Sequence, residues 1–335
     1  MMSNATVISR IWNSKLAQCV LVLGVILLGL WVPTIVKSTF YLGLFINAII
    51  LGIAALSIGF LAHQCGLIMF GAAGFTGGAT YLFGIAVMHF QMNAMAAAAF
   101  CLLLATFISL VIGMVVVRAR PLPFAMLTLA LAQMLRSVVK ITAYRELTGG
   151  DDGLTMNWNG HFFGLTQAEL ARPATFWAVA WLALCGVMLL AWWVGQSRMG
   201  EILRATKANE ERMRFSGFNT YLPRVLAFGL AGFIAAVSGL LMGLHSAFAS
   251  PELLDFTTGA NSLVSMLIGG AGVVSGPVLG ALLYTVGQDQ FGASGHLELL
   301  TGIGVVAVVV AFPLGAIGFL QSGMRRLTGR QYVAN

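Results

Sequence analysis

The sequence predicts an all-α fold, a polytopic transmembrane helical bundle, from its composition and from the length of its apolar runs. Of its 335 residues, 59% are hydrophobic and only 9% are charged. A soluble domain carries about 25% charged residues, so this chain has too few to cover a surface that faces water. Its apolar runs reach roughly 20 residues, the length that crosses about 30 Å of hydrocarbon. We therefore expect a single transmembrane domain over residues 1–335.

The apolar runs predict about ten membrane segments. The longer runs lie near residues 17–36, 40–62, 67–88, 93–117, 122–144, 174–196 and 223–245. The shorter runs lie near residues 257–270, 274–288 and 298–320. Arg10 and Lys15 precede the first run, but no small-residue cleavage site clearly closes it, which indicates a retained span rather than a secretory signal peptide.

The charges predict which loops face the cytoplasm, because short cytoplasmic loops collect Lys and Arg. The basic clusters are Arg10/Lys15, Arg118/Arg120, residues 198–224 and Arg325/Arg326/Arg330. Acidic residues outside residues 198–224 fall in the alternate loops: Glu146, Asp151, Asp152, Glu169, Glu252, Asp255, Asp289 and Glu298. The two patterns agree on cytoplasmic termini, a cytoplasmic segment at 198–222 and an extracytoplasmic loop at 145–173.

Glycine-rich stretches interrupt two of the predicted regions, residues 63–80 and residues 269–277. Unpaired backbone at membrane depth is tolerated only where protein or a water-filled cavity covers it. These stretches are therefore either glycine-broken or re-entrant helices that line a pathway, or places where helices pack tightly on glycine. The sequence leaves both interpretations open.

The placement of charges argues against an ion-coupled transporter and against an enzyme. No Asp or Glu falls inside a predicted span, so the usual carboxylate for proton or sodium coupling is missing. The chain has no G-x-x-x-x-G-K-[ST] phosphate-binding loop, no H-E-x-x-H and no G-x-S-x-G. We expect no catalytic residue, no metal site and no cofactor in this chain; if ATP drives it, ATP and Mg²⁺ bind to another subunit.

Arg136 and Lys140 lie four residues apart on one helical face near the outer end of a predicted span. Lys140 can extend its ammonium group to the interface. Arg136 lies a turn deeper, where a charge is costly unless it is paired or hydrated. It either lines the mouth of the pathway or anchors the helix by bonding to carbonyl groups.

The longest charged stretch runs from Gln196 to Arg224 and has the spacing of a short amphipathic helix. Apolar or small residues recur at helical intervals, and Gly217 is placed to end the helix. Such a helix either lies in the headgroup region or docks on a soluble partner. Periodicity alone does not decide between them.

The stretch RMGEILRATKANEERMRFSGFN resembles the cytoplasmic coupling segment of the branched-chain amino acid permease family of ABC importers, of the type called the M subunit. The family pattern is approximately G-R-x-x-x-A-x-x-x-N-E-x-x-A-x-x-x-G-x-N. Glu201 and Met213 depart from it. The matching residues are Gly200, Ala205, Asn209, Glu210, Gly217 and Asn219.

Three further blocks are similar to the same family in the same order, so the resemblance covers approximately residues 50–320. One block is TLALAQMLRSVVKITAYRELTGGDDGL, which keeps Arg136 and the Thr-Gly-Gly run but has Gln133 in place of Glu. Another is LIGGAGVVSGPVLGALL, which keeps the glycines and Pro277. In CGLIMFGAAGFTGGATY, Met69 and Ala72 replace an expected Ser and His, which suggests a solute other than Leu, Ile and Val, or polar contacts from a partner.

The resemblance implies an importer in the bacterial cytoplasmic (inner) membrane with a second, homologous permease, two cytoplasmic ATP-binding subunits and an extracytoplasmic solute-binding protein. No nucleic acid is expected among its partners. The implied ATPase-coupling residues are Gly200, Arg204, Ala205, Asn209, Glu210 and Gly217. Candidate pathway residues are Gly71, Phe75, Arg136, Gly269, Gly270 and Gly272. Asp151 and Asp152 either dock the binding protein or form a solvated turn.

The function expected from this sequence is import of branched-chain amino acids or related small polar solutes such as other amino acids, amides or urea, driven by ATP hydrolysis on separate subunits. The competing hypothesis is a stand-alone channel or secondary transporter for a small solute. Because selectivity in such systems rests largely with the binding protein, the sequence does not name the solute.

Overall fold

The structure is a computed structural model that describes residues 24, 27–36, 38–158, 160–292 and 302. These residues are almost entirely α-helical, which confirms the predicted fold class. The first predicted segment is described only over residues 24 and 27–36. Apart from residue 302, the last predicted segment near 298–320 lies outside the described residues, as do both termini and the terminal basic clusters. The count of about ten segments and the position of the termini therefore stay predictions.

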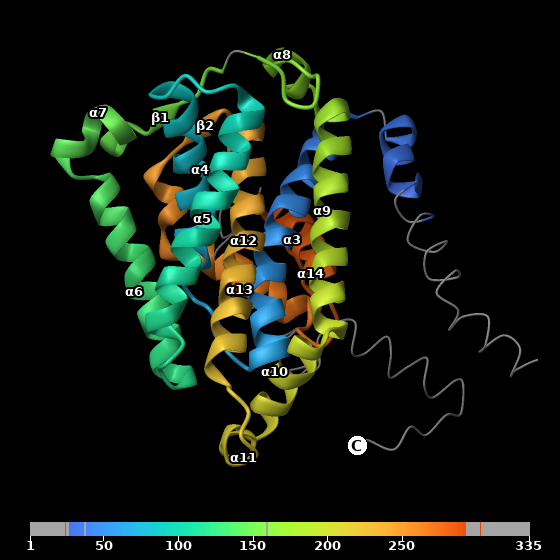
Figure 1. Cartoon of the computed structure of the whole chain (residues 1–335). Helices are drawn as coiled ribbons and strands as arrows, with labels where there is room; N and C mark the ends of the chain where they lie inside the picture. Colours follow the sequence, from blue (N-terminus) through green and yellow to red (C-terminus); the bar gives the residue numbers. More distant parts are fainter. Residues whose placement is uncertain (1–23, 25–26, 37, 159, 293–301, 303–335) are drawn as a thin grey trace, which may run out of the picture.

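Five helices of the described chain are long and apolar enough to cross a membrane. They are α3 (Thr39–Cys65), α5 (Ala94–Val116), α6 (Pro121–Val139), α9 (Pro173–Gln196) and α12 (Tyr221–Ser246). Three shorter helices pack in the described bundle, the apolar α4 (Ala72–Met88), and α13 (Phe256–Gly269) and α14 (Gly276–Gly292). Figure 1 shows the long helices running side by side, with α6 at one flank and α9 at the other.

Short elements connect these helices at the two ends of the bundle. One end carries η1 (Thr142–Tyr144), α7 (Arg145–Thr148), η2 (Gly150–Asp152), β1 (Leu154–Thr155), α8 (Gln167–Leu170), β2 (Phe248–Ala249) and η3 (Pro251–Leu254). The other end carries α10 (Arg198–Ala208) and α11 (Glu210–Phe215). Strands β1 and β2 pair antiparallel, Leu154 with Ala249, and so fasten the predicted 145–173 loop to the segment after α12.

The described basic clusters and acidic loops separate to opposite ends, as the charge pattern predicts. At what we call the basic end, the Arg118 guanidinium lies over the Tyr221 ring, which joins the α5–α6 turn to the start of α12. At the acidic end, an Arg136 to Asp255 ion pair joins the end of α6 to the start of α13. Because short cytoplasmic loops collect Lys and Arg, we expect the basic end to face the cytoplasm.

Helix α12 is the centre of the bundle, where it contacts α3, α4 and α5. Its glycines let neighbouring backbones approach closely, because a Cβ on Gly239 would collide with the Thr76 carbonyl and one on Gly232 would collide with Ser109. The hydrophobic effect contributes little to the association of helices inside lipid, so close packing and hydrogen bonds must hold the helices together.

Hydroxyl groups bond across these close contacts to main-chain carbonyls of the facing helix. Ser238 Oγ donates to the Ile50 carbonyl of α3 at 2.7 Å. Thr80 Oγ1 of α4 donates to the Gly239 carbonyl at 2.8 Å. Each bond satisfies a hydroxyl that lipid would leave unpaired.

The first glycine-rich interruption is a break between two helices. Helix α3 ends at Gly66, whose φ of +69° suits a residue without Cβ. Helix α4 then begins after Gly71, where the backbone amides of Phe70 and Gly71 donate to Thr128 Oγ1 at 3.2 and 3.4 Å. The break thus lies at residues 66–71, and the glycines further on are inside α4.

The second interruption is the turn of a helical hairpin formed by α13 and α14. A Cβ on Gly269 would collide with the Gly276 carbonyl, and one on Gly280 would collide with the Ser265 carbonyl. Tyr284 Oη donates to Asn261 Oδ1 at 2.8 Å and extends the antiparallel register. The structure therefore supports tight packing on glycine at residues 269–276.

The close approach along α12 predicts a large penalty for one added methyl group. We expect Gly239→Ala to lower the free energy of unfolding by about 1–3 kcal/mol, because the new Cβ overlaps a main-chain carbonyl that cannot rotate away. The matched control is Gly186→Ala in α9, where the added Cβ meets nothing within 4 Å. Equal melting temperatures of the two variants in mild detergent would contradict the packing account.

Candidate functional site

The segment α10–α11 at the basic end, with the turn that follows α11, contains every residue assigned to ATPase coupling. Its start is fixed by Ser197, which caps α10 by accepting the Gly200 amide at 3.4 Å. Gly200 is buried against the last turn of α9, because a Cβ there would collide with the Gly195 carbonyl. Gly200 therefore makes a tight joint between a membrane helix and the coupling segment.

Two basic side chains tie α10 to the ends of the membrane helices. Arg204 Nη1 donates to Gln64 Oε1 at 3.2 Å and also to the Gly195 carbonyl. Lys207 Nζ donates to the carbonyls of Ala62 and His63 at 2.9 and 3.1 Å. These carbonyls belong to the last turn of α3, where a cation complements the helix dipole. Arg204 thus faces the membrane domain, and α10 is bonded to the ends of α3 and α9.

The coupling segment is two helices, so the single amphipathic helix expected within residues 196–224 is wrong. The chain breaks at Asn209, whose φ of −159° and ψ of 99° are extended. Asn209 Oδ1 accepts the Arg212 amide at 2.9 Å and so caps the new helix α11. Asn is a poor residue inside a helix and a good one at its start, which a spacing argument overlooked. Ala205 lies at the end of α10, where its carbonyl accepts the Asn209 amide.

Glu210 and Gly217 fix the direction of α11. Glu210 pairs with Arg214 at 2.9 Å and with Arg224 at 2.8 Å, which joins α11 to the start of α12. Gly217 has a φ of +81°, and the amide of Gly217 bonds to the Arg214 carbonyl while that of Phe218 bonds to the Met213 carbonyl. This is a Schellman ending, so the predicted capping role of Gly217 is confirmed.

Two aromatic side chains on this segment were missed by the sequence reasoning. The phenyl ring of Phe215 at the end of α11 is 86% exposed, and that of Phe218 is 50% exposed. Figure 1 shows α11 projecting beyond the ends of the long helices. An aromatic ring within a charged segment was the available signal, since a solvated charged helix has no need of one.

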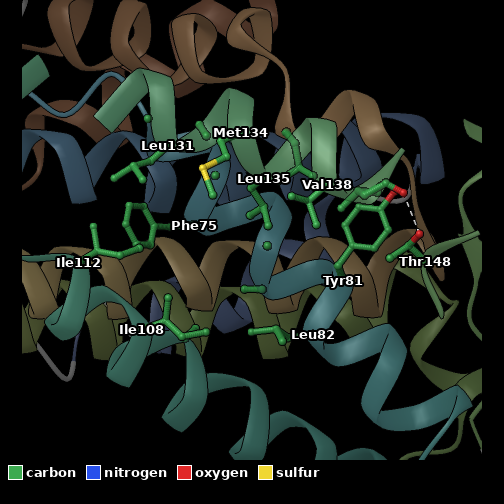
Figure 2. Close-up of a pocket in the computed structure, with 18 of the residues that line it drawn as sticks. Phe75, Tyr81, Leu82, Ile108, Ile112, Leu131, Met134, Leu135, Val138 and Thr148 are labelled. Atoms are coloured by element: carbon green, nitrogen blue, oxygen red, sulfur yellow. Dashed lines mark hydrogen bonds between the residues drawn. The ribbon is translucent and has the colours of Figure 1, made fainter. Parts of the chain in front are cut away.

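A second candidate site is an apolar cavity of about 470 Å³ between α4, α5 and α6. Figure 2 shows side chains of the three helices facing one another across it, among them Phe75, Ile108 and Leu135. Its few polar groups include the hydroxyl of Tyr81, which is buried and has no hydrogen-bond partner within the described chain. Such a wall suits an aliphatic group better than a charged one.

Two of the six predicted pathway residues line this cavity, Gly71 and Phe75. The Phe75 ring packs edge-on against Phe228 at a centroid distance of 5.6 Å. Gly269 and Gly270 lie instead at the α13–α14 turn, and Gly272 lies in that turn with nothing within 4 Å of an added Cβ. None of these three turn glycines lines the apolar cavity that Gly71 and Phe75 border.

Met69 and Ala72, the positions that depart from the family pattern, are fully buried. Neither residue lines the apolar cavity. The proposed link between these two positions and the cargo therefore receives no support from the geometry.

Arg136 does not line the cavity either, although its neighbour Leu135 does. Its Nη1 lies 3.2 Å from Asp255 Oδ1, with both side chains about one-third exposed. The geometry is that of an anchor between α6 and the start of α13, bonded to a carboxylate where carbonyl groups were expected.

Asp151 and Asp152 lie in the exposed η2 turn at the acidic end. Lys140 Nζ lies 2.7 Å from Asp151, and Arg145 lies 2.7 Å from Asp152. The hydrogen bond and charge of Lys140 lower the pKa of the Asp151 carboxyl. Gly149, Gly150 and Gly153 around them all have positive φ, as a tight turn requires. Both carboxylates are thus already paired with basic side chains at the same end of the bundle.

No group of three or more His, Cys, Asp or Glu residues that could hold a metal ion occurs in the described part of the chain.

Residues 40–316 match the family described as the permease component of branched-chain amino acid transport systems. The chain belongs to this permease family. The matched range agrees with the extent of the resemblance seen in the sequence blocks.

Curated relatives of the permease carry different solute names. The ribose import permease protein RbsC of Escherichia coli K12 is 26% identical over 235 residues, 67% of this chain and 70% of RbsC. The high-affinity branched-chain amino acid permease LivH of Salmonella typhimurium LT2 is 25% identical over 206 residues, 59% of this chain and 67% of LivH. LivM of Escherichia coli K12 is 22% identical over 257 residues, 71% of this chain and 60% of LivM. No solved structure matches the permease.

The anchor interpretation of Arg136 predicts measurable coupling to Asp255. In a double-mutant cycle with Arg136→Met and Asp255→Asn, we expect a coupling free energy of about 1 kcal/mol in detergent unfolding. Asn keeps the cap that Asp255 gives to the Phe256 amide.

The control is the same cycle with Arg145→Met and Asp152→Asn, whose side chains are 64% and 76% exposed. Solvent screens that pair, so its coupling should not exceed experimental error. Equal coupling in the two cycles would remove the anchor role from Arg136.

Proposed function

We propose that the permease is the membrane-spanning subunit of an ATP-driven importer for branched-chain amino acids or related small polar solutes. The observation that carries this proposal is the α10–α11 segment, which is fixed to α3 and α9 by Arg204 and Lys207 and presents Phe215 to the surroundings. A rigid element with an exposed aromatic ring is suited to dock on a partner. Family membership and the named relatives support the same function.

The energy for transport comes, in this proposal, from outside the chain. The sequence has no phosphate-binding loop, so ATP and Mg²⁺ bind to two cytoplasmic ATP-binding subunits and the permease is not itself an enzyme. Closure of those subunits pushes on α11, and α10 transmits the displacement to α3 and α9. Alternating access then follows from a change in how packed helices meet.

A second permease and an extracytoplasmic solute-binding protein complete the proposed assembly in the bacterial inner membrane. The outward faces of α5 and α6 are apolar and largely exposed, so lipid or another membrane subunit covers them. The paired carboxylates Asp151 and Asp152 leave little free charge for the binding protein. We therefore place docking of that protein on the ordered 145–173 loop as a whole, by complementary shape.

The competing function, a stand-alone channel or secondary transporter, predicts transport by this chain alone in liposomes without ATP. Its ion-coupled form lacks the usual intramembrane carboxylate. It also gives no purpose to an exposed Phe215 beyond the membrane helices.

Removing the Phe215 ring should weaken docking of the ATP-binding subunits. We expect Phe215→Ala to raise the dissociation constant of those subunits at least tenfold, as truncation of a central aromatic costs about 2 kcal/mol or more. Binding is measured on the purified permease complex, and ATP-dependent uptake is measured after reconstitution.

Phe163→Ala is the matched control, because the Phe163 ring is 71% exposed but lies in the loop at the opposite end. It should bind the ATP-binding subunits as the unchanged permease does. Unchanged binding and uptake by Phe215→Ala would remove the coupling role from α11.

The solute is tested on the complete importer, because relatives are named for both ribose and branched-chain amino acids. We expect ATP-dependent uptake of radiolabelled leucine to exceed that of ribose at least tenfold with the cognate binding protein. Preferential uptake of ribose would assign the importer to sugars and leave the coupling proposal intact.

A further inference from the structure

A polar cavity of about 520 Å³ lies at the basic end, beside the coupling segment. It is enclosed by the end of α3, the α5–α6 turn, the α10–α11 joint and the start of α12. Five cationic side chains and one carboxylate, Glu210, line it. The cationic residues are Arg118, Arg120, Lys207, Arg214 and Arg224.

The positive charges that line this basic cavity are only partly neutralised by carboxylates. Glu210 serves both Arg214 and Arg224, and Lys207 bonds to uncharged carbonyls. Arg118 lies 5.3 Å from the centre of the Tyr221 ring. Within the described chain, neither Arg118 nor Arg120 forms an ion pair. The cavity therefore carries excess positive charge and suits a phosphate group.

The apolar cavity begins on the same helices, a short distance deeper in the bundle. On α5, Val117 lines the basic cavity and Ile112 lines the apolar one, about 8 Å apart along the helix axis. On α6, Pro121 lines the basic cavity and Thr128 lines the apolar one, about 10 Å apart along the helix axis. A charged compartment at the membrane surface thus leads toward an apolar one within it.

Exposed aliphatic side chains flank the route between the two cavities. Val115 of α5 is 71% exposed and Leu122 of α6 is 82% exposed. These residues give the outer faces of α5 and α6 an apolar surface that suits contact with lipid hydrocarbon. Basic pockets at the cytoplasmic ends of membrane helices bind anionic lipid headgroups by this combination of charge and depth.

We propose that the basic cavity binds the phosphate of an anionic phospholipid from the cytoplasmic leaflet, with an acyl chain directed along α5 and α6 toward the apolar cavity. A cationic cavity followed by an aliphatic surface complements a lipid, whose anionic headgroup is followed by an acyl chain. A soluble phosphate or an acidic peptide has no such chain. A bound lipid would brace the α5–α6 turn against the joint at Asn209, which links lipid composition to the position of α11.

Native mass spectrometry of the full-length permease tests this site, with phosphatidylglycerol as the probe and zwitterionic phosphatidylcholine as its comparison. We expect phosphatidylglycerol to bind at least tenfold more tightly than phosphatidylcholine. The double variant Arg118→Gln/Arg120→Gln should abolish this preference. The charge-matched control, Arg198→Gln/Arg212→Gln, removes two cations that do not line the cavity and should keep it.

Three outcomes would overturn the proposal. One is equal loss of the preference in both double variants at equal melting temperature, which would show unspecific attraction to the basic end. Another is full competition by soluble glycerol phosphate at the same concentration, which would show a free phosphate site without the acyl contact. The third is loss of the bound lipid when the ATP-binding subunits assemble, which would assign the cavity to those subunits.

Discussion

The close approach of helix backbones along α12 is the constraint on which the rest of the structure depends. Inside lipid, helices are not driven together by apolar side chains, because the surrounding hydrocarbon is equally apolar. Gly232 and Gly239 let α5 and α4 lie almost backbone to backbone with α12. Hydroxyls such as those of Thr80 and Ser238 then bond to carbonyls across the contact. Side chains larger than hydrogen at these glycines would separate the central helices.

The two functional regions follow from this packed centre. With α3, α4, α5 and α12 held together, α6 rests against α4 with fewer contacts and leaves the apolar cavity between them. At the basic end, the joint at Gly200 and the bonds of Arg204 and Lys207 attach α10 to the same rigid core. In the proposed coupling, a displacement applied at α11 reaches α3 through α10, which these contacts hold against the core.

The sequence predicted the helices better than the site. Apolar runs and loop charges located the described membrane helices to within a few residues, because length and charge are properties of single segments. The break at Asn209 depended on a side-chain cap, which periodicity does not contain. The sequence located the glycine-rich interruption at 269–277, but its role as a tight turn depended on how the two flanking helices pack together. Phe215 and Phe218 were overlooked because charge spacing, and not exposed apolar area, was the signal followed.

The pathway prediction shows the same limit. Glycine-rich patterns mark close packing and pathway linings alike, and the sequence left both interpretations open. In the structure, Gly71 borders a cavity whereas Gly269 meets the carbonyl of Gly276 across a hairpin. The ion pair of Arg136 with Asp255 joins residues distant in the chain, so no local sequence pattern predicts it.

In the proposed mechanism, the ATP-binding subunits dock on α11 and displace it when they hydrolyse ATP. Site-specific photo-crosslinking from position 215, in membranes that contain the complete importer, tests it most directly. The account predicts a crosslink to an ATP-binding subunit whose yield changes when ATP is added. Crosslinks to lipid alone, with a yield independent of ATP, would contradict it.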